Sequence, residues 1–262
     1  TGIDIYSRAA KLLKPVHLEL GGKNPQIVMD DANIDLAVDG VLFGAFGTAG
    51  QRCTATSRLI IHKNVYNEVI DKLLARVKAM KMGDPTDPKI DIGPVSSDDQ
   101  ENKILEYIQI GLNEGAKLIC GGKKVTGGEF DKGYFIEPTI FEAVQGMRIT
   151  KEEIFGPVLA VMKAEDFEDA VRQANDVDYG LSSSIYTKNV NLAFRAIDEL
   201  EAGITYINAP TIGAEIQLPF GGIKNTGNGG REAGTTAIEE FTEIKTVFID
   251  YSDKLQKAQI DR

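Results

Sequence analysis

The sequence has few of the side chains that build metal centres or disulfide frameworks. Its 262 residues include two cysteines and two histidines, far apart in the chain, which excludes a zinc-type ligand cluster and a disulfide scaffold. No apolar run approaches the roughly 20 residues that a membrane-spanning helix needs, and no signal-peptide pattern opens the chain. The G-x-G-x-x-G and Walker patterns are also missing, so a nucleotide-binding fingerprint is absent.

The composition is typical of a folded, acidic protein. Hydrophobic residues make up 42% of the chain and charged residues 26%, which are ordinary values for a globular domain. With 29 basic against 39 acidic residues, the net charge is −10, a field that would repel nucleic acids and anionic membranes. We therefore expect a cytoplasmic α/β protein that has neither nucleic acid nor membrane as a partner.

Strand and helix patterns alternate along most of the chain. This alternation predicts a three-layer αβα fold, in which helices cover both faces of a mostly parallel sheet. Hydrophobic periodicity and capping residues predict helices at 3–13, 34–46, 65–80, 98–113, 167–175 and 193–200, and strands at 16–20, 25–29, 59–62, 117–120, 158–163, 183–186, 204–207 and 243–251.

Both ends of the chain suggest a neighbour outside this sequence. A helix at the first residues, with no cap or strand before it, indicates that the chain begins inside a larger domain. The last predicted strand, 243–251, has to pair with something. Another subunit and the edge of the chain's own sheet are the two alternatives.

Cys53 is the candidate nucleophile. Glycines spaced by three and Arg52 precede it, and glycines let a ligand approach the backbone closely. Arg52 or a following helix start would lower the thiol pKa, and a thiolate is the strongest side-chain nucleophile at neutral pH. The alternative is a buried, inert cysteine, which is also our interpretation of Cys120 in a predicted buried strand. Pairing of Cys53 with His17 or His62 has no support from the pattern.

Further candidate residues lie near glycines and paired acids. Glu19 stands in an apolar stretch before a double glycine, where burial would raise its pKa towards the range of a general base; an edge glutamate facing water is the alternative. The acids at 152–153 precede an aromatic residue and a Gly-Pro turn, either as a solvated helix end or as the wall of a ligand site. Residues 219–222 and 227–232 form glycine-rich loops.

Together these segments resemble the NAD(P)-dependent aldehyde dehydrogenase superfamily over nearly the whole chain. Residues 18–25 (LELGGKNP) are similar to its glutamate signature and residues 47–53 (GTAGQRC) to its cysteine signature, at the expected separation. Residues 152–158 (EEIFGPV) and 219–224 (PFGGIK) resemble two further motifs in the expected order.

The resemblance implies a chemical role for the two signature residues. Cys53 would attack an aldehyde carbonyl to give a thiohemiacetal, which passes hydride to nicotinamide and leaves a thioester. Glu19 would activate the water that hydrolyses this thioester. The backbone N–H of Cys53 would stabilise the oxyanion, a contribution of roughly 3 kcal/mol per donor.

The resemblance also implies a cofactor, NAD or NADP, and residues that meet it. Glu153 would hold the nicotinamide ribose with Phe155 packed beside it, and Leu20 and Gly21 would lie near the ring. Glu232 resembles a glutamate with a proton-relay role, although the loop before it is one residue longer than the common pattern.

Family members are nearly twice as long as this chain, and their N-terminal half supplies most of the dinucleotide-binding domain. The resemblance therefore predicts that residues 1–20 are a remnant of that domain and residues 21–240 the catalytic domain. Residues 241–262 would be an oligomerisation strand and a tail that join copies into a homo-oligomer. Cofactor binding would be incomplete in this chain, and its activity alone weak or absent.

The substrate class is indicated by two features. Arg52 beside the nucleophile and residues 208–213 (NAPTIG) resemble the subgroup that acts on α-ketoglutarate semialdehyde, and a guanidinium suits a carboxylate-bearing aldehyde; a structural role for Arg52 is the alternative. Two other functions stay open: a cofactor-free thiol esterase that uses Cys53 and Glu19, and a non-enzymatic assembly module that adds residues 243–251 to a partner's sheet.

Overall fold

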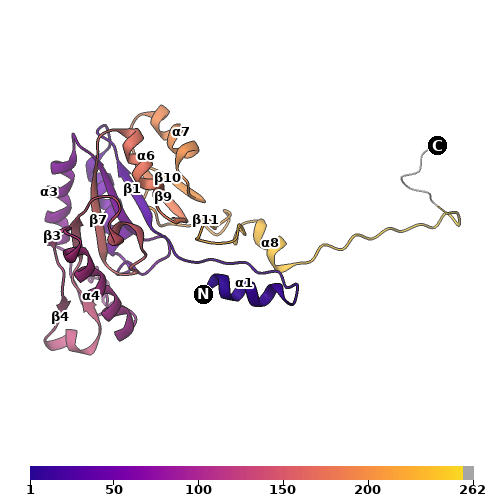
Figure 1. Ribbon diagram of the computed structural model, residues 1–262, viewed down its shortest axis with the longest axis horizontal. Helices are drawn as coiled ribbons and strands as arrows, with labels where there is room; N and C mark the ends of the chain where they lie inside the picture. The colour runs from indigo at the N-terminus through magenta and orange to yellow at the C-terminus, as the bar shows by residue number, and fades with distance from the viewer. Residues whose placement is uncertain (256–262) are drawn as a thin grey trace.

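The computed structural model describes residues 1–255, and its centre is a seven-stranded sheet (Figure 1). The strand order is β10-β9-β1-β2-β7-β6-β3, and every neighbouring pair is parallel except β3 with β6. The predicted mostly parallel sheet is thus confirmed. The strands are β1 (Asn24–Val28), β2 (Thr56–His62), β3 (Lys117–Cys120), β6 (Thr139–Glu142), β7 (Val158–Ala164), β9 (Ser182–Tyr186) and β10 (Ile204–Ile207).

Helices cover both faces of this sheet, as the alternation of patterns predicts. Figure 1 shows α3 and α4 on one side of the strands and α6 and α7 on the other. The first group is α2 (Ile34–Val41), which continues into a π-helical turn (Leu42–Phe46), α3 (Tyr66–Val77) and α4 (Asp98–Asn113). The second group is α6 (Phe167–Asn175) and α7 (Val190–Glu199).

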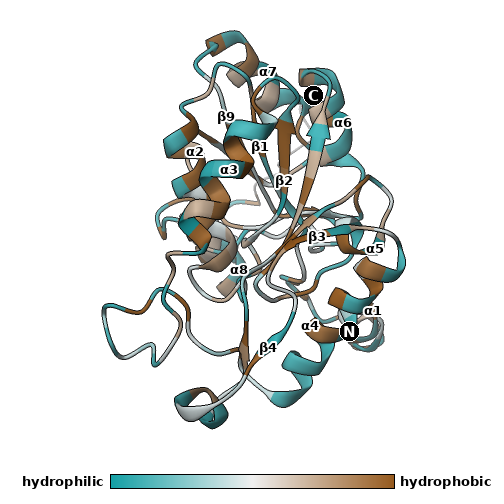
Figure 2. Ribbon diagram, turned by 90° about the vertical axis from the view of Figure 1, so that its left-hand side faces the viewer, coloured by the Kyte–Doolittle hydropathy of each residue, from teal (hydrophilic) through white to brown (hydrophobic). Residues whose placement is uncertain are grey.

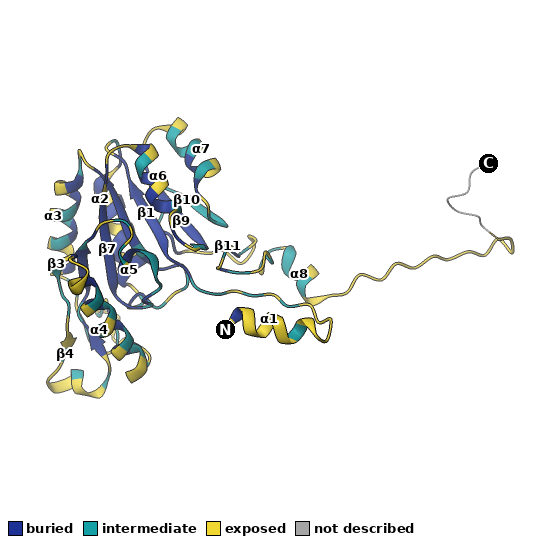
Figure 3. Ribbon diagram, viewed as in Figure 1, coloured by how far each residue is buried: buried dark blue, intermediate teal, exposed yellow. Residues whose placement is uncertain are grey.

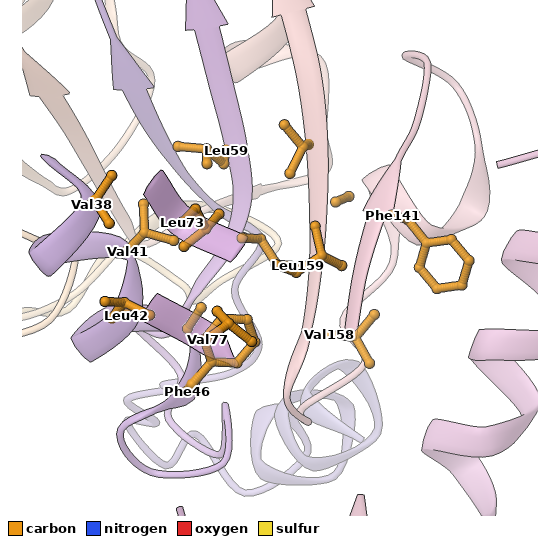
Figure 4. Close-up of a cluster of buried hydrophobic side chains, with 14 of the residues drawn as sticks. Val38, Val41, Leu42, Phe46, Leu59, Leu73, Val77, Phe141, Val158 and Leu159 are labelled. Atoms are coloured by element: carbon orange, nitrogen blue, oxygen red, sulfur yellow. The ribbon is translucent and has the colours of Figure 1, made fainter. Parts of the chain in front are cut away.

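Two apolar clusters fasten these layers together. In the larger one, Val38 and Val41 of α2 and Leu73 of α3 pack with Leu59 of β2 and Leu159 of β7 (Figure 4). The apolar colour in Figure 2 accordingly concentrates in the central strands around β2. Central parallel strands are buried on both faces, and β1 is buried at all five positions.

Side-chain caps account for the helices whose bounds match the prediction. The Ser97 hydroxyl accepts the Gln100 N–H at 3.2 Å at the start of α4, and the Asp166 carboxylate accepts the Asp169 N–H at 2.8 Å at the start of α6. Such caps satisfy amide groups that have no partner inside the helix. Because the capping residue is visible in the sequence, the predicted bounds 98–113 and 167–175 are confirmed.

Several short elements were not predicted from the sequence. One of them is β6, which pairs with a strand on each side. The predicted strand 117–120 is confirmed as β3, but it lies at the sheet edge with Cys120 only half-buried, so its predicted burial is wrong. The others are the hairpin β4 (Lys124–Val125) and β5 (Phe135–Ile136), a 3-10 turn (Gly128–Lys132), α5 (Arg148–Lys151), the pair β8 (Tyr179–Gly180) and β11 (Ile223–Lys224), and α8 (Thr236–Phe241).

The predicted strand 16–20 is also wrong. Its backbone is held by a loop rather than by a neighbouring strand, because the Asn228 side chain accepts the Leu18 N–H at 2.9 Å and donates to the Val16 carbonyl. A single bridge joins Glu19 to Gly227. This arrangement gives residues 16–20 an extended path outside the sheet.

Helix α1 (Gly2–Ala10) and the segment after α8 are largely exposed (Figure 3), and exposed apolar residues lie in both. Helix α1 leaves Ile3 84% exposed. Near the other end, residues 243–251 have no strand neighbour within the described chain, and Phe248 is 93% exposed. The alternative that this segment is an edge strand of the chain's own sheet is therefore wrong. None of the helices among residues 1–255 has the length and apolar character needed to cross a bilayer.

Candidate active site

Cys53 and Glu19 are brought together because each precedes one of two neighbouring strands. Cys53 lies three residues before the start of β2 and Glu19 five residues before the start of β1. These strands are parallel, with Asn24 opposite Thr56. The Cys53 carbonyl packs so closely on Gly22 that a Cβ there would lie 2.3 Å from its oxygen. A side chain at position 22 would thus displace the nucleophile.

The surroundings of Cys53 keep its thiol protonated at rest. The side chain is half-buried, and burial raises the thiol pKa above its ordinary value, helped by the negative charges of Glu19 and Glu153. The N–H of Thr54 opposes this rise. The expected lowering by Arg52 or a helix start is therefore wrong: the Arg52 side chain is exposed, and a strand follows the cysteine. Formation of the thiolate needs a nearby base.

Glu19 has the acidity of such a base. Partial desolvation raises the pKa of its carboxyl to about 7, and the charges of Glu232 and Glu240 add to the rise, while Arg231 opposes it. The expected rise in the Glu19 pKa, and burial as its main cause, are confirmed. The residue as a whole is nevertheless exposed, as the alternative of a glutamate facing water predicts. A group with this pKa is half ionised near neutral pH, where it can both accept and release a proton.

The glycine-rich loop brings Glu232 to the same place. A Cβ on Gly221 would lie 2.9 Å from Oε1 of Glu19, and the Phe220 N–H donates to the Glu232 carbonyl at 2.6 Å. The Glu232 side chain remains exposed. The structure thus places a second carboxylate within electrostatic range of Glu19, with its own access to water.

Glu153 reaches the double glycine from the other side. Its Oε1 accepts the Gly22 N–H at 2.9 Å, and a Cβ on Gly21 would lie 2.7 Å from its Oε2. Phe155 has a positive φ of 60°, and its carbonyl accepts a hydrogen bond from Gln100 at 2.8 Å. Gly21 and the Glu153 carboxylate therefore lie close together, and Phe155 follows Glu153 by two residues.

Leu20 has a different neighbour. A Cβ on Gly2 would lie 2.6 Å from Cδ1 of Leu20, so the leucine packs against the first turn of α1. Its backbone N–H donates to the Thr226 carbonyl at 2.7 Å. These contacts join α1 to the glycine-rich loop beside the site.

Gly50, in the segment that leads to Cys53, packs against the backbone of Gly156, in the segment that carries Glu153. Its φ is +66°, and a Cβ would lie 2.0 Å from the Gly156 carbonyl oxygen. We expect Gly50→Ala to lower the free energy of unfolding by more than about 2 kcal/mol, because backbone strain and a clash add. Gly128→Ala is the matched control, since it has a similar φ of +61° and open space around it. Urea unfolding of both variants measures the difference, and equal losses would contradict the clash.

Three buried polar residues near the site escaped prediction. Lys23 is fully buried beside Arg58, and burial together with that guanidinium lowers the lysine pKa to about 7. Asn24 and Thr211 hydrogen-bond to the backbone around Cys53. A charged or polar side chain at the start of an apolar strand is the signal that marks Lys23 and Asn24; Thr211 has none. Within residues 1–255, no group of three or more acidic, histidine or cysteine side chains is arranged to hold a metal ion.

The family model for the aldehyde dehydrogenase family matches residues 1–247. The chain belongs to the aldehyde dehydrogenase family. The resemblance carried by the four sequence motifs is thereby confirmed. The α-ketoglutaric semialdehyde dehydrogenase of Bacillus subtilis is 46% identical over 233 residues, which make up 88% of this chain and 48% of that protein. The 2,5-dioxopentanoate dehydrogenase of Saccharolobus solfataricus is 47% identical over 235 residues, 89% of this chain and 48% of that protein.

The fold agrees with solved members of the family. The betaine aldehyde dehydrogenase of Staphylococcus aureus in complex with NAD+ has a TM-score of 0.87 and 38% identity, covering 92% of this chain and 48% of that chain. This aldehyde dehydrogenase chain therefore spans about half the length of the relatives that it matches.

Proposed function

We propose that this chain is the catalytic part of an aldehyde dehydrogenase that oxidises an aldehyde to a carboxylic acid with NAD(P)+. The observation that carries the proposal is a thiol of raised pKa within electrostatic range of a carboxyl of pKa about 7, each ahead of one of two neighbouring parallel strands. A thiol nucleophile and a general base are the two groups that acyl chemistry through a thioester requires.

The proposed reaction assigns each proton to a group on this chain. Cys53 transfers its proton to Glu19, which releases it to solvent, and the sulfur attacks the aldehyde carbon, while the Cys53 backbone N–H donates to the oxyanion of the thiohemiacetal. The hydride of this carbon would pass to the acceptor that bound NAD or NADP supplies, and a thioester would remain on Cys53. Glu19 then takes a proton from water, the hydroxide adds to the thioester carbonyl, and collapse expels the Cys53 thiolate, which regains its proton from the carboxylic acid and leaves a carboxylate product. Glu232 is the proposed relay that passes the proton from Glu19 to solvent.

The residues around the double glycine fit the nicotinamide end of the cofactor. One oxygen of Glu153 holds the Gly22 N–H; the other, Oε2, has no hydrogen-bond donor among the described residues and is free to accept a ribose hydroxyl. We assign this role to Glu153, with Phe155, Leu20 and Gly21 close by. When bound, NAD or NADP supplies the hydride acceptor. This chain carries no dinucleotide fingerprint for the rest of the cofactor.

We propose a semialdehyde that bears a carboxylate as the substrate. Two of the relatives are named for α-ketoglutaric semialdehyde and 2,5-dioxopentanoate. The Arg52 side chain is exposed one residue before Cys53 and has no ion-pair partner among residues 1–255, so it is available to a substrate carboxylate. The division into residues 1–20, 21–240 and 241–262 and the cytoplasmic location stay predictions, and residues 256–262 of the last segment lie outside the described residues.

We also propose that residues 243–251 pair with a second copy of the chain. They have the alternating pattern of a strand, they are exposed, and β10 ends the sheet with a free edge. We expect deletion of residues 243–262 to convert the assembly into a monomer, because a large apolar surface would lose its partner. Light scattering coupled to size exclusion measures the mass. An unchanged mass after deletion would contradict this pairing.

Turnover measurements test the proposed activity. Reduced-nicotinamide absorbance would be followed with a panel of semialdehydes and with both NAD+ and NADP+, first for the chain alone and then with the N-terminal half of a relative added. The proposal predicts weak or no signal alone and signal that depends on Cys53 after addition. Signal that persists in Cys53→Ala would overturn it.

A further inference from the structure

Three consecutive carbonyls at the candidate nucleophile accept hydrogen bonds from buried side chains of other segments. The Asn24 amide donates to the Cys53 carbonyl at 2.8 Å and to the Ala55 carbonyl at 2.9 Å. The Thr211 hydroxyl donates to the Thr54 carbonyl between them at 2.7 Å. Asn24 is 1% exposed and Thr211 0%. The turn formed by residues 53–55 is therefore held at each of its three carbonyls by a side chain from another segment.

Both donors are themselves fixed, and they share one anchor. The Asn24 Oδ1 accepts the Ser182 N–H at 3.0 Å, which determines the orientation of the amide. The Ser182 hydroxyl donates to the Thr211 carbonyl at 2.6 Å. Ser182 is the first residue of β9, so both donors are attached to the rigid sheet.

The number of hydroxyl hydrogens decides which hydroxyl donates in the contact between Thr211 and Thr56. The single hydrogen of Thr211 Oγ1 is used on the Thr54 carbonyl. The Thr56 hydroxyl, 2.8 Å from Thr211 Oγ1, must therefore be the donor in that contact. A Cβ on Gly44 would lie 2.1 Å from Thr56 Oγ1, so the glycine of the π-helical turn leaves the space that this hydroxyl needs.

The turn has little regular structure of its own. It lies between a π-helical segment and β2, and its one backbone turn bond among the described residues runs from the Ala55 N–H to the Arg52 carbonyl at 3.0 Å. The N–H groups of Thr54 and Cys53 are also the groups that oppose the rise in the Cys53 pKa. A shift of this turn would move these N–H groups away from the sulfur, including the Cys53 N–H that is assigned to the oxyanion.

We propose that Asn24 and Thr211 are positioning residues for Cys53, which clamp residues 53–55 so that the sulfur and the neighbouring N–H groups keep the geometry for attack. The proposal rests on the proposed role of Cys53. It also connects the segment 208–213, which precedes the PFGG loop, directly to the nucleophile through Thr211. A change in that segment would then alter the reactivity of Cys53 without touching the substrate.

Alkylation of Cys53 by iodoacetamide tests the clamp in the 262-residue chain, across pH 6 to 10. Peptide mass spectrometry follows Cys53 and Cys120 separately, so that Cys120 reports non-specific changes. For Asn24→Ala and Thr211→Val we expect the Cys53 rate at pH 8 to fall roughly fivefold, as for one lost hydrogen bond, and the midpoint of its pH profile to move upward. Thr211→Ser, which keeps the hydroxyl, should restore both.

Thr205→Val is the matched control, because it removes a part-buried hydroxyl contact of 3.0 Å to Ser183 in the adjacent strand. It should leave the Cys53 profile unchanged. Folded Asn24→Ala and Thr211→Val variants with the wild-type profile would overturn the proposal. If neither variant folds, hydrogen exchange in the unchanged chain decides: a clamp predicts an Ala55 amide as protected as those of β2, and rapid exchange refutes it.

Alkylation needs no aldehyde, cofactor or turnover. Failure of the clamp therefore appears in these profiles, whereas failure of the proposed function appears as activity that survives Cys53→Ala.

Discussion

Cys53→Ala is expected to reduce hydrolysis of an activated ester by the chain to the background rate. It should also reduce aldehyde oxidation in the completed enzyme, by more than about 10³-fold. The alanine removes the atom that forms the covalent bond and leaves the oxyanion N–H and Glu19 in place. Ester hydrolysis measures the acyl half of the reaction without the cofactor.

Cys120→Ala is the matched control for this prediction. Cys120 is the only other cysteine, it is half-buried in the edge strand β3, and its thiol pKa is also raised by burial. Both rates should stay within twofold of wild type in this variant. Equal loss in the two variants would show that thiol loss acts through stability, and retained activity in Cys53→Ala would remove the cysteine from the mechanism.

Glu19→Gln is expected to slow thioester hydrolysis by about 10² to 10⁴-fold, the usual contribution of a general base. The amide keeps the size of the side chain but accepts no proton from water. Acylation of Cys53 should change less than deacylation, because a thiol is far more acidic than water and depends less on a base. An initial burst of ester cleavage should therefore be followed by a slow phase. Stopped-flow measurement of product release separates these two phases.

The pH profile of the slow step follows from the sign of the Glu19 shift. The carboxyl pKa is raised to about 7, so below pH 7 the group is protonated and unable to accept a proton. Deacylation should therefore rise about tenfold per pH unit up to pH 7 and level off above it. Glu232→Gln removes a neighbouring negative charge that raises this pKa, so its profile should move to lower pH. A profile without a midpoint near 7 in the wild-type chain would contradict the assignment.

The sheet and most helices could be predicted because their signals are local. Ser97 and Asp166 cap α4 and α6 at positions that a reader of the sequence can identify. Strand β1 ends in Ile27 and Val28, between a double glycine and two aspartates. The predictions for two segments were wrong because strand pairing depends on residues far away in the sequence. Residues 16–20 and 243–251 have the pattern of strands, but a pattern does not say whether an edge is available for pairing.

For the candidate site, the sequence indicated the residues but not the long-range contacts that set their pKa values. Cys53 and Glu19 were visible as residues beside glycines, but their electrostatics depend on groups far away in sequence. The Cys53 pKa is raised by burial and by Glu19 and Glu153, whereas the sequence neighbour Arg52 points to solvent. Thr211 lies 157 residues from the Thr54 carbonyl that it holds. Contacts at such separation follow from the sheet order, which no local pattern contains.

Detection of the acyl-enzyme is the most direct test of the proposed role of Cys53. Glu19→Gln would be mixed with an activated acetyl ester, quenched in acid within the slow phase, and digested for peptide mass spectrometry. Our account predicts an acetyl group on Cys53 at close to one per chain, with Cys120 unmodified and no adduct on the same peptide in Cys53→Ala. Acetylation elsewhere with an unmodified Cys53 would contradict the account.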